Sequence, residues 1–411
     1  MRDFLDFLDA SPSSFHAARE VAKLLPGFRQ HDETEELEAN PGGHYIIRGG
    51  AIVAWWVPTG TPNAFRIVGS HTDSPGFMLK PVPEVRLAGW QQAQVEVYGG
   101  PILASWFDRE LEFAGRIVTF DGEEKLVRTP PAFRIPHLAI HLTRDNNLTL
   151  DKQQHMQPIF AAFEGAESIA DLIAQHAEVD PNEIAAWDLI TRDTQPARTF
   201  GVEDACIAAG RLDNLSSVYA SAKAFAEATQ HAHDHNEILV LACFDHEEIG
   251  SNTASGAAGP LLQDVLTRIA HACGADTETL LRMYARSTCV SADAAHAVHP
   301  NYMAKYDPAS VAHLNAGPVL KINANQRYAT NASTSAMWLR ACRAADVPYQ
   351  KFVSRNDVPC GSTIGPITAT RLGISTVDVG IPLLSMHSAR ELAGVRDMEW
   401  FTRALYEYFV G

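Results

Sequence analysis

Residues 236–251 read Asn-Glu-Ile-Leu-Val-Leu-Ala-Cys-Phe-Asp-His-Glu-Glu-Ile-Gly-Ser, and the rest of the chain is organised around this stretch. Its apolar run, 238–244, has the length of a strand that is buried on both faces of a sheet. Four ionisable residues follow directly, at 245–248. Ligands bind at the carboxyl ends of strands in α/β sheets, and adjacent carboxylates repel each other unless a cation or a proton intervenes. The stretch therefore predicts a metal site at a sheet edge, with a solvated acidic loop as the alternative.

Length and composition indicate a globular protein of more than one domain. A chain of 411 residues exceeds one ordinary hydrophobic core, so we expect two domains or one domain with a large insertion. The hydrophobic fraction of 46% and the charged fraction of 20% are typical of globular proteins. No apolar stretch approaches the roughly 20 residues that span a bilayer, and the N-terminus is acidic where a signal peptide is cationic. We therefore expect a cytoplasmic protein with no membrane partner.

Charge, cysteines and missing motifs exclude several function classes. The 33 basic and 49 acidic side chains give a formal net charge of −16, which repels nucleic acid, so we expect no nucleic-acid partner. The six cysteines include no Cys-x-x-Cys pair, so neither a disulfide framework nor a thiolate zinc site is indicated. The chain also lacks the Gly-x-Ser-x-Gly, His-Glu-x-x-His and Gly-x-x-x-x-Gly-Lys motifs of serine hydrolases, helix-based zinc peptidases and phosphate-binding loops.

Strand-like and helical patterns alternate in the two outer parts of the chain, which predicts an α/β fold there. A helix is expected behind the capping pair Ser11-Pro12. The other expected helices cover 215–226 and 261–273, and the expected strands cover 44–47, 51–56, 65–69, 238–244, 288–291, 319–322 and 376–379.

The part of the chain between these outer parts shows a different pattern of predicted elements. Short alternating strands are expected at 94–98, 112–119 and 125–128, with helical patterns at 169–177 and 183–190. None of this resembles a βαβ unit. We therefore expect an inserted β-rich domain over 85–199, which interrupts a discontinuous domain formed by 1–84 and 200–411.

Five segments place an imidazole or a carboxylate at the predicted end of a strand or the start of a helix. Each alone has an ordinary explanation as a core histidine or a helix cap, but together they supply the N and O donors of a zinc site. One tetrahedral ion cannot use all of them, whereas two ions about 3.5–4 Å apart can, if one carboxylate bridges them. One of two adjacent glutamates can then bind metal while the other acts as a general base. The residues are His71 and Asp73, Asp213, Glu247 and Glu248, Asp293, and His387.

These segments resemble sequence blocks of the M18 family of metallo-aminopeptidases, the aspartyl aminopeptidases, and they occur in the same order along the chain. The matching blocks are Ser-His-Thr-Asp-Ser-Pro (70–75), Arg-Leu-Asp-Asn (211–214), Asp-His-Glu-Glu-Ile-Gly-Ser (245–251), Ser-Ala-Asp-Ala-Ala-His-Ala-Val-His-Pro-Asn-Tyr (291–302) and Met-His-Ser-Ala-Arg-Glu (386–391). The resemblance implies an α/β zinc-metallopeptidase domain with a central mixed sheet flanked by helices, interrupted by an inserted β-rich dimerisation domain. It also implies a large homo-oligomer, typically a dodecamer built from dimers.

The resemblance also implies a ligand set for two Zn²⁺ ions. Asp213 would be the bridging ligand. His71 and Asp293 would complete one zinc site, and Glu248 and His387 the other. Mn²⁺ or Co²⁺ are possible substitutes at N/O sites of this kind.

Two further carboxylates take catalytic roles in the same resemblance. Asp73 falls where the family's carboxylate orients the His71 imidazole. Glu247 would be the general base of a two-zinc, bridging-water mechanism, taking a proton from the water and giving it to the leaving amine. The implied reaction removes N-terminal Asp or Glu from peptides.

Two residues are implied in substrate binding. Lys321 would pair with the acidic side chain of the substrate, with an ordinary surface lysine as the alternative, and His141 would reach the active site of a neighbouring subunit. A di-metal aminopeptidase of broader or different specificity is one alternative function, and a non-catalytic oligomeric scaffold is another. The residues without an assigned role are Asp245, His246, His137, His296 and His299.

Overall fold

Strand β13 (Glu237–Phe244) lies inside the largest sheet, where it pairs with β3 (Ala51–Val57) and β4 (Ala64–His71). Its residues from 238 to 244 are all buried, which confirms the predicted buried strand. The computed structural model describes residues 1–143, 148–163, 165–232 and 236–411.

The largest sheet has nine strands in the order β1-β2-β3-β13-β4-β14-β18-β16-β17. Strands β4 and β14 are parallel neighbours, and β13 is parallel to β4 on its other side, whereas β3 is antiparallel to β13. The sheet is therefore mixed, and the carboxyl ends of β4, β13 and β14 meet at one edge. The remaining strands are β1 (Arg29–Gln30), β2 (Gly42–Arg48), β14 (Thr288–Ala292), β16 (Val319–Ile322), β17 (Gln350–Val353) and β18 (Ser375–Gly380).

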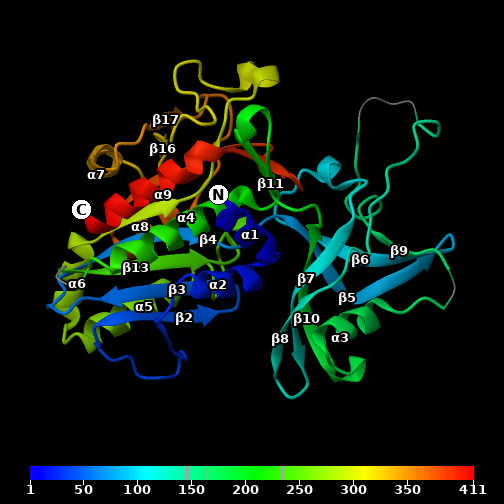
Figure 1. Ribbon diagram of the computed structural model, residues 1–411, viewed down its shortest axis with the longest axis horizontal. Coiled ribbons are helices and arrows are strands. Elements are labelled where there is room, and N and C mark those ends of the chain that lie inside the picture. Colours follow the sequence, from blue (N-terminus) through cyan, green and yellow to red (C-terminus); the bar gives the residue numbers. More distant parts are fainter. Residues whose placement is uncertain (144–147, 164, 233–235) are drawn as a thin grey trace.

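Helices cover both faces of this sheet, because alternate residues of each inner strand point to opposite faces. On β13, Leu239 and Leu241 pack into one core with helices α1, α2, α4, α7 and α9, while Val240 packs into a second core with α5, α6 and α8. The α/β fold with a central mixed sheet flanked by helices is thus confirmed (Figure 1). The helices are α1 (Arg2–Ala10), α2 (Ser14–Lys23), α4 (Leu212–Thr229), α5 (Leu261–Ala272), α6 (Thr277–Arg286), α7 (Ala332–Ala344), α8 (Ile364–Leu372) and α9 (Val395–Val410).

A six-stranded antiparallel sheet, in the order β8-β7-β10-β5-β6-β9, forms a second lobe with its own core, the inserted lobe, whose strands lie between β4 and β11 (Arg198–Phe200) in the chain (Figure 1). Its strands run from Gly76 to Asp193 along the chain, and its assignment as a separate dimerisation domain over 85–199 stays a prediction. The elements are β5 (Gly76–Leu87), β6 (Trp90–Tyr98), β7 (Leu111–Thr119), β8 (Glu124–Arg128), β9 (Ile159–Ala161), β10 (Ile184–Asp193) and α3 (Ile169–Ala177).

One helix predicted in this lobe is wrong. The helical pattern at 183–190 belongs to β10, which pairs antiparallel with β7 from Ile184 opposite Thr119 to Asp193 opposite Leu111. The alanines of this segment favour a helix locally, but pairing along the full length of β7 outweighs that weak preference. The other predicted helix, 169–177, is confirmed as α3.

A small five-stranded sheet presents the loop that carries His387. Its order is β11-β12-β20-β19-β15, and the loop joins β19 (Pro382–Leu384) to β20 (Glu391–Gly394). The other strands are β11 (Arg198–Phe200), β12 (Cys206–Ala209) and β15 (Ala295–His296). In the part of the chain that the structure describes, no helix is both long enough and apolar enough to cross a bilayer.

Candidate metal centre

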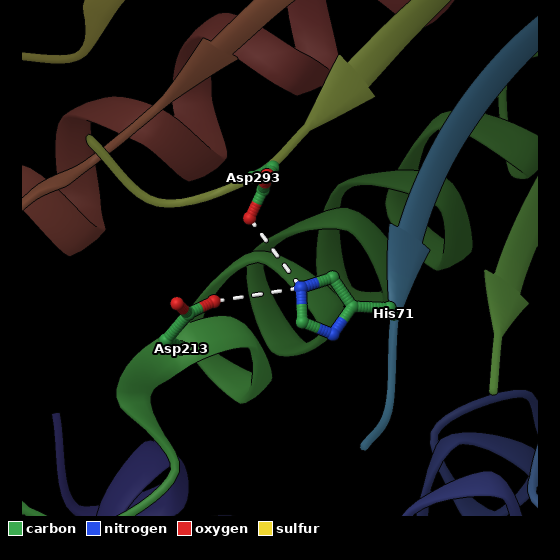
Figure 2. Close-up of side chains that lie close together, drawn as sticks. All are labelled: His71, Asp213 and Asp293. Carbon is green, nitrogen blue, oxygen red and sulfur yellow. Dashed lines mark ion pairs between the residues drawn. The ribbon is translucent and has the colours of Figure 1, made fainter. Parts of the chain in front are cut away.

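Three side chains converge at the edge where the parallel strands end (Figure 2). His71 ends β4, Asp213 lies in the first turn of α4, and Asp293 directly follows β14. Nε2 of His71 lies 3.4 Å from Oδ1 of Asp213 and 3.4 Å from Oδ1 of Asp293. All three residues are buried, so one imidazole and two carboxylates form a ligand set that suits zinc.

A second set of side chains shares Asp213 with the first. Nε2 of His387 lies 3.3 Å from Oδ2 of Asp213 and 3.3 Å from Oε2 of Glu248. Glu248 lies in η4 (Glu247–Ile249), the short 3₁₀ helix that follows β13. Asp213 therefore offers one oxygen to each histidine, which is the arrangement a bridging carboxylate needs.

The buried oxygens of these side chains suit a bound cation. Oε1 of Glu248 is buried and makes no hydrogen bond among the described residues, and the buried Oδ1 of Asp213 makes none there either, although it faces Nε2 of His71 at 3.4 Å. A buried charged oxygen without a partner is costly, and a bound cation removes that cost. The donor atoms of each cluster also lie within 4.8 Å of one another.

Burial and the neighbouring carboxylates raise the pKa values of the two glutamates in this cluster. Burial raises the pKa of Glu247 to about 7; the facing His71 lowers it in part, and Asp293 and Asp213 raise it. Burial and the nearby Asp213 likewise raise the pKa of Glu248 well above its ordinary value. A bound cation would oppose these upward shifts, because its positive charge favours the ionised carboxylates.

Each histidine is oriented through its Nδ1 atom. Nδ1 of His71 lies 3.1 Å from the backbone oxygen of Asp73 and 3.3 Å from its Oδ1 atom. Nδ1 of His387 lies 3.1 Å from the backbone oxygen of Gly100. Each acceptor favours a proton on Nδ1, which leaves Nε2 free to ligate a metal.

Two buried carboxylates accept hydrogen bonds from the backbone of residues in these two clusters. Asp73 accepts hydrogen bonds from the backbone N–H groups of Glu247 and Glu248, both at 3.0 Å. Glu391 accepts the N–H of Asp213 at 3.0 Å and the N–H of His387 at 2.7 Å. Glu391 has no role predicted from the sequence, although this residue ends the matching block 386–391.

Comparison with known proteins identifies the family. The family model for the aminopeptidase I zinc metalloproteases (M18) matches residues 7–409. The chain belongs to the M18 family. The resemblance of the five sequence blocks to M18 is thus confirmed, and so is Zn²⁺ as the cofactor, because M18 proteins are zinc aminopeptidases and the clusters described above can hold metal ions.

Individual M18 relatives match over nearly the whole chain. A "probable M18 family aminopeptidase 2" of Streptomyces coelicolor is 47% identical over 417 residues, covering 99% of this chain and 96% of the relative. The protein of the same name in Mycobacterium tuberculosis is 42% identical over 416 residues, covering 98% and 96%.

Solved M18 structures share the fold. The cryo-EM structure of the Ape4 and Nbr1 complex contains a chain that is 35% identical, with a TM-score of 0.96 over 100% of this chain and 85% of that chain. A chain of the S. cerevisiae mApe1 dodecamer is 26% identical, with a TM-score of 0.88 over 99% and 95%.

Of the remaining predicted site residues, Glu247 and Lys321 lie beside the two clusters, whereas His141 lies away from them. Oε2 of Glu247 lies 4.0 Å from Nε2 of His71, farther away than the nearest oxygens of Asp213 and Asp293. Lys321 is buried, and its Nζ lies 3.5 Å from Oδ2 of Asp293. His141 lies exposed in a turn of the inserted lobe, outside the cluster. The roles of these residues stay predictions.

Some residues without an assigned role have local partners. Nδ1 of His137 lies 3.0 Å from a carboxylate oxygen of Asp108, and His299 accepts the N–H of Asn301 at a helix start. Nδ1 of His246 lies 2.9 Å from Oγ1 of Thr253. Asp245 is buried, and His296 lines a cavity of about 190 Å³ beside the ring of Tyr328.

Removal of Zn²⁺ is expected to cost more stability at about pH 8 than at about pH 5.5. Without zinc, the raised pKa of Glu247 stabilises the folded state at low pH. This stabilisation is complete below pH 4.5, the ordinary pKa of the group, and is lost as the pH rises through about 7. Burial lowers the pKa of His71, but Asp213, Asp293 and Asp73 raise it well above its ordinary value, so its contribution is also lost as the pH rises. A bound cation replaces these protons.

Thermal melting of chelated and zinc-loaded protein tests this expectation. The difference in Tm between the two forms should widen as the pH rises, because only the chelated form loses these contributions. A difference that stays constant across this pH range would contradict proton displacement by the metal.

Proposed function

We propose that this M18 aminopeptidase removes N-terminal Asp and Glu from peptides with two Zn²⁺ ions and Glu247 as general base. The observation that carries the two-ion part is the position of Asp213, which gives one oxygen to His71 and the other to His387. The proposed ligands of one ion are His71, Asp213 and Asp293, and those of the other are Asp213, Glu248 and His387.

The residues of the chain divide the chemistry among them. When bound, Zn²⁺ polarises the scissile carbonyl and lowers the pKa of water in the site. Glu247 accepts the proton of the attacking water and then donates it to the leaving amine. Asp73 supports this role because it accepts the backbone N–H of Glu247 and lies 3.3 Å from Nδ1 of His71. It thereby fixes the position of the proposed base Glu247 relative to the proposed ligand His71.

The acidic specificity rests on one buried cation. A protein with a net charge of −16 repels an acidic peptide at long range, so a local positive charge must attract it. Lys321 supplies that charge, with Nζ 3.5 Å from Oδ2 of Asp293 and 5.1 Å from the centre of the Tyr328 ring. The competing proposal of broader specificity is favoured by another observation, that Lys321 is 1% exposed and already faces Asp293.

An assay on four substrates tests the proposed function. The chelated and the zinc-reconstituted protein are compared on the anilides of Asp, Glu, Ala and Leu, together with metal analysis. We expect activity only after reconstitution and a higher kcat/KM for the acidic pair. Equal rates on the Leu substrate would establish the broader specificity, and inactivity of protein with two bound Zn²⁺ ions would favour a non-catalytic scaffold.

The variant Lys321→Met is expected to lower kcat/KM for the Asp substrate by at least about 10-fold while changing the Ala substrate much less. The physical reason is that a hydrogen bond to a charged group contributes more than a neutral one and serves only the acidic side chain. Lys351→Met is the matched control, because Lys351 is exposed on the neighbouring strand β17. An equal loss on both substrates would assign Lys321 to the support of Asp293 instead.

We propose a homo-oligomer, a dodecamer, because a similar chain assembles as the S. cerevisiae mApe1 dodecamer. Exposed apolar side chains at Leu138, Ile140 and Leu142 surround His141 in the inserted lobe, which suits a subunit contact that carries His141 to a neighbouring site. Analytical ultracentrifugation tests the assembly, since a monomer of 44.9 kDa in solution would contradict it.

The cytoplasmic location also stays a proposal.

A further inference from the structure

Residues 98–100, at the end of β6 in the inserted lobe, contact side chains of the metal centre. We propose that this segment positions both zinc sites, with Tyr98 as a positioning residue that acts through Asp73. The inference rests on the zinc ligands of the proposed function and adds to them a role in metal binding for the inserted lobe.

Tyr98 reaches the first site through the Asp73 carboxylate. The buried Tyr98 donates its hydroxyl hydrogen to Oδ2 of Asp73 at 2.7 Å. The same carboxylate accepts the backbone N–H groups of Glu247 and Glu248 and faces Nδ1 of His71. Among these donors, the Tyr98 hydroxyl is the one that comes from the inserted lobe, so the position of Asp73 depends on that lobe as well as on the loop of Glu247 and Glu248. A displaced Asp73 would move His71 and both glutamates together.

Gly100 reaches the second site directly. Its backbone oxygen lies 3.1 Å from Nδ1 of His387 and so accepts the proton there. This hydrogen bond selects the tautomer in which Nε2 faces Asp213 and Glu248, at 3.3 Å from each. The orientation of His387 therefore depends on where the inserted lobe places Gly100.

Gly99 allows the segment to approach this closely. A Cβ atom at Gly99 would lie 3.2 Å from Cβ of Glu248 and 3.3 Å from its backbone oxygen. The residue also has a φ of +68°, where a side chain is strained. A side chain at position 99 would push against the loop that presents Glu248.

From one short stretch of chain, Tyr98 thus contacts the carboxylate that supports the first ligand set, and Gly100 contacts His387 of the second. Outer contacts of this kind orient metal ligands and commonly change metal affinity when they are removed. The inserted lobe is therefore part of the metal centre as well as a candidate subunit interface.

The test compares Tyr98→Phe with Tyr284→Phe in the full-length protein. Tyr284 is a buried tyrosine on α6 whose hydroxyl lies 3.2 Å from Oγ1 of Thr267, so its removal takes away a hydroxyl contact elsewhere. We expect Tyr98→Phe to weaken Zn²⁺ binding, measured by chelator competition, by about 10- to 100-fold. At saturating zinc we expect kcat to fall about 10-fold with KM within about two-fold of the parent.

A spectroscopic measurement separates positioning from general stability. In the cobalt-substituted protein, Tyr98→Phe should shift the visible absorption bands of Co²⁺, whereas Tyr284→Phe should not. Metal affinity and the cobalt spectrum need no substrate, so a failed acidic specificity would leave this test intact. Parent-like zinc affinity and cobalt bands in Tyr98→Phe would overturn the inference, and so would equal losses in both variants. If Tyr98→Phe does not fold, Gly99→Ala decides by the same two measurements.

Discussion

Glu247→Gln is expected to lower kcat by about 10³-fold while both Zn²⁺ ions stay bound. The substitution keeps the shape of the side chain but removes the group that takes up a proton. Oε2 of Glu247 lies 4.0 Å from Nε2 of His71, whereas the proposed ligand Glu248 places its oxygen 3.3 Å from Nε2 of His387. The backbone N–H of Glu247 keeps its bond to Asp73, so the loop should not move. Rates on the Asp anilide and zinc analysis of the same sample provide the measurement.

The matched control for this variant is Glu203→Gln. Glu203 also lies in a short 3₁₀ helix, η3 (Val202–Asp204), but is exposed on the surface. We expect this control to keep the parental kcat and zinc content. Full activity in Glu247→Gln would refute the general-base role. A fall from two bound Zn²⁺ ions to one would show instead that Glu247 is a ligand, as the cluster of His71, Glu247 and Glu248 allows.

The sequence could predict that the segments with proposed metal ligands lie close together, because this follows from the order and direction of the strands. His71, Glu248 and Asp293 each follow a short apolar run, and such runs are recognisable as buried strands from composition alone. Since β4, β13 and β14 are parallel, their carboxyl ends meet at one edge. The placement of polar residues directly after these runs therefore carried the information about the metal centre.

The contacts that support the proposed ligands could not be predicted, because they depend on tertiary geometry that leaves no local signal in the sequence. Tyr98 ends an ordinary alternating strand, and nothing beside it indicates that its hydroxyl meets Asp73, 25 residues away in sequence. Glu391, at the start of β20 in the small sheet, accepts the N–H groups of Asp213 and His387. The helix predicted at 183–190 failed for a related reason, since pairing with the distant β7 outweighs local preference.

Asp213→Ala is expected to abolish measurable hydrolysis and to reduce zinc binding at both sites, the largest combined loss that we expect for one residue. Asp213 gives Oδ1 to the site of His71 and Oδ2 to the site of His387, each within 3.4 Å of the imidazole nitrogen. Alanine removes both oxygens, and the remaining buried carboxylates lose the cations that compensate their charge. Each site would keep only two of its proposed ligands.

Zinc analysis and thermal melting distinguish this bridging role from a ligand role at one site. The bridge predicts that zinc content falls toward zero and that added Zn²⁺ no longer raises Tm, because both ligand sets are broken at once. Asp264→Ala is the matched control, since Asp264 also lies in the first turn of a helix, α5, but is exposed. Retention of one tightly bound Zn²⁺ ion in Asp213→Ala would contradict the bridge, because a complete site would then survive without either oxygen of Asp213.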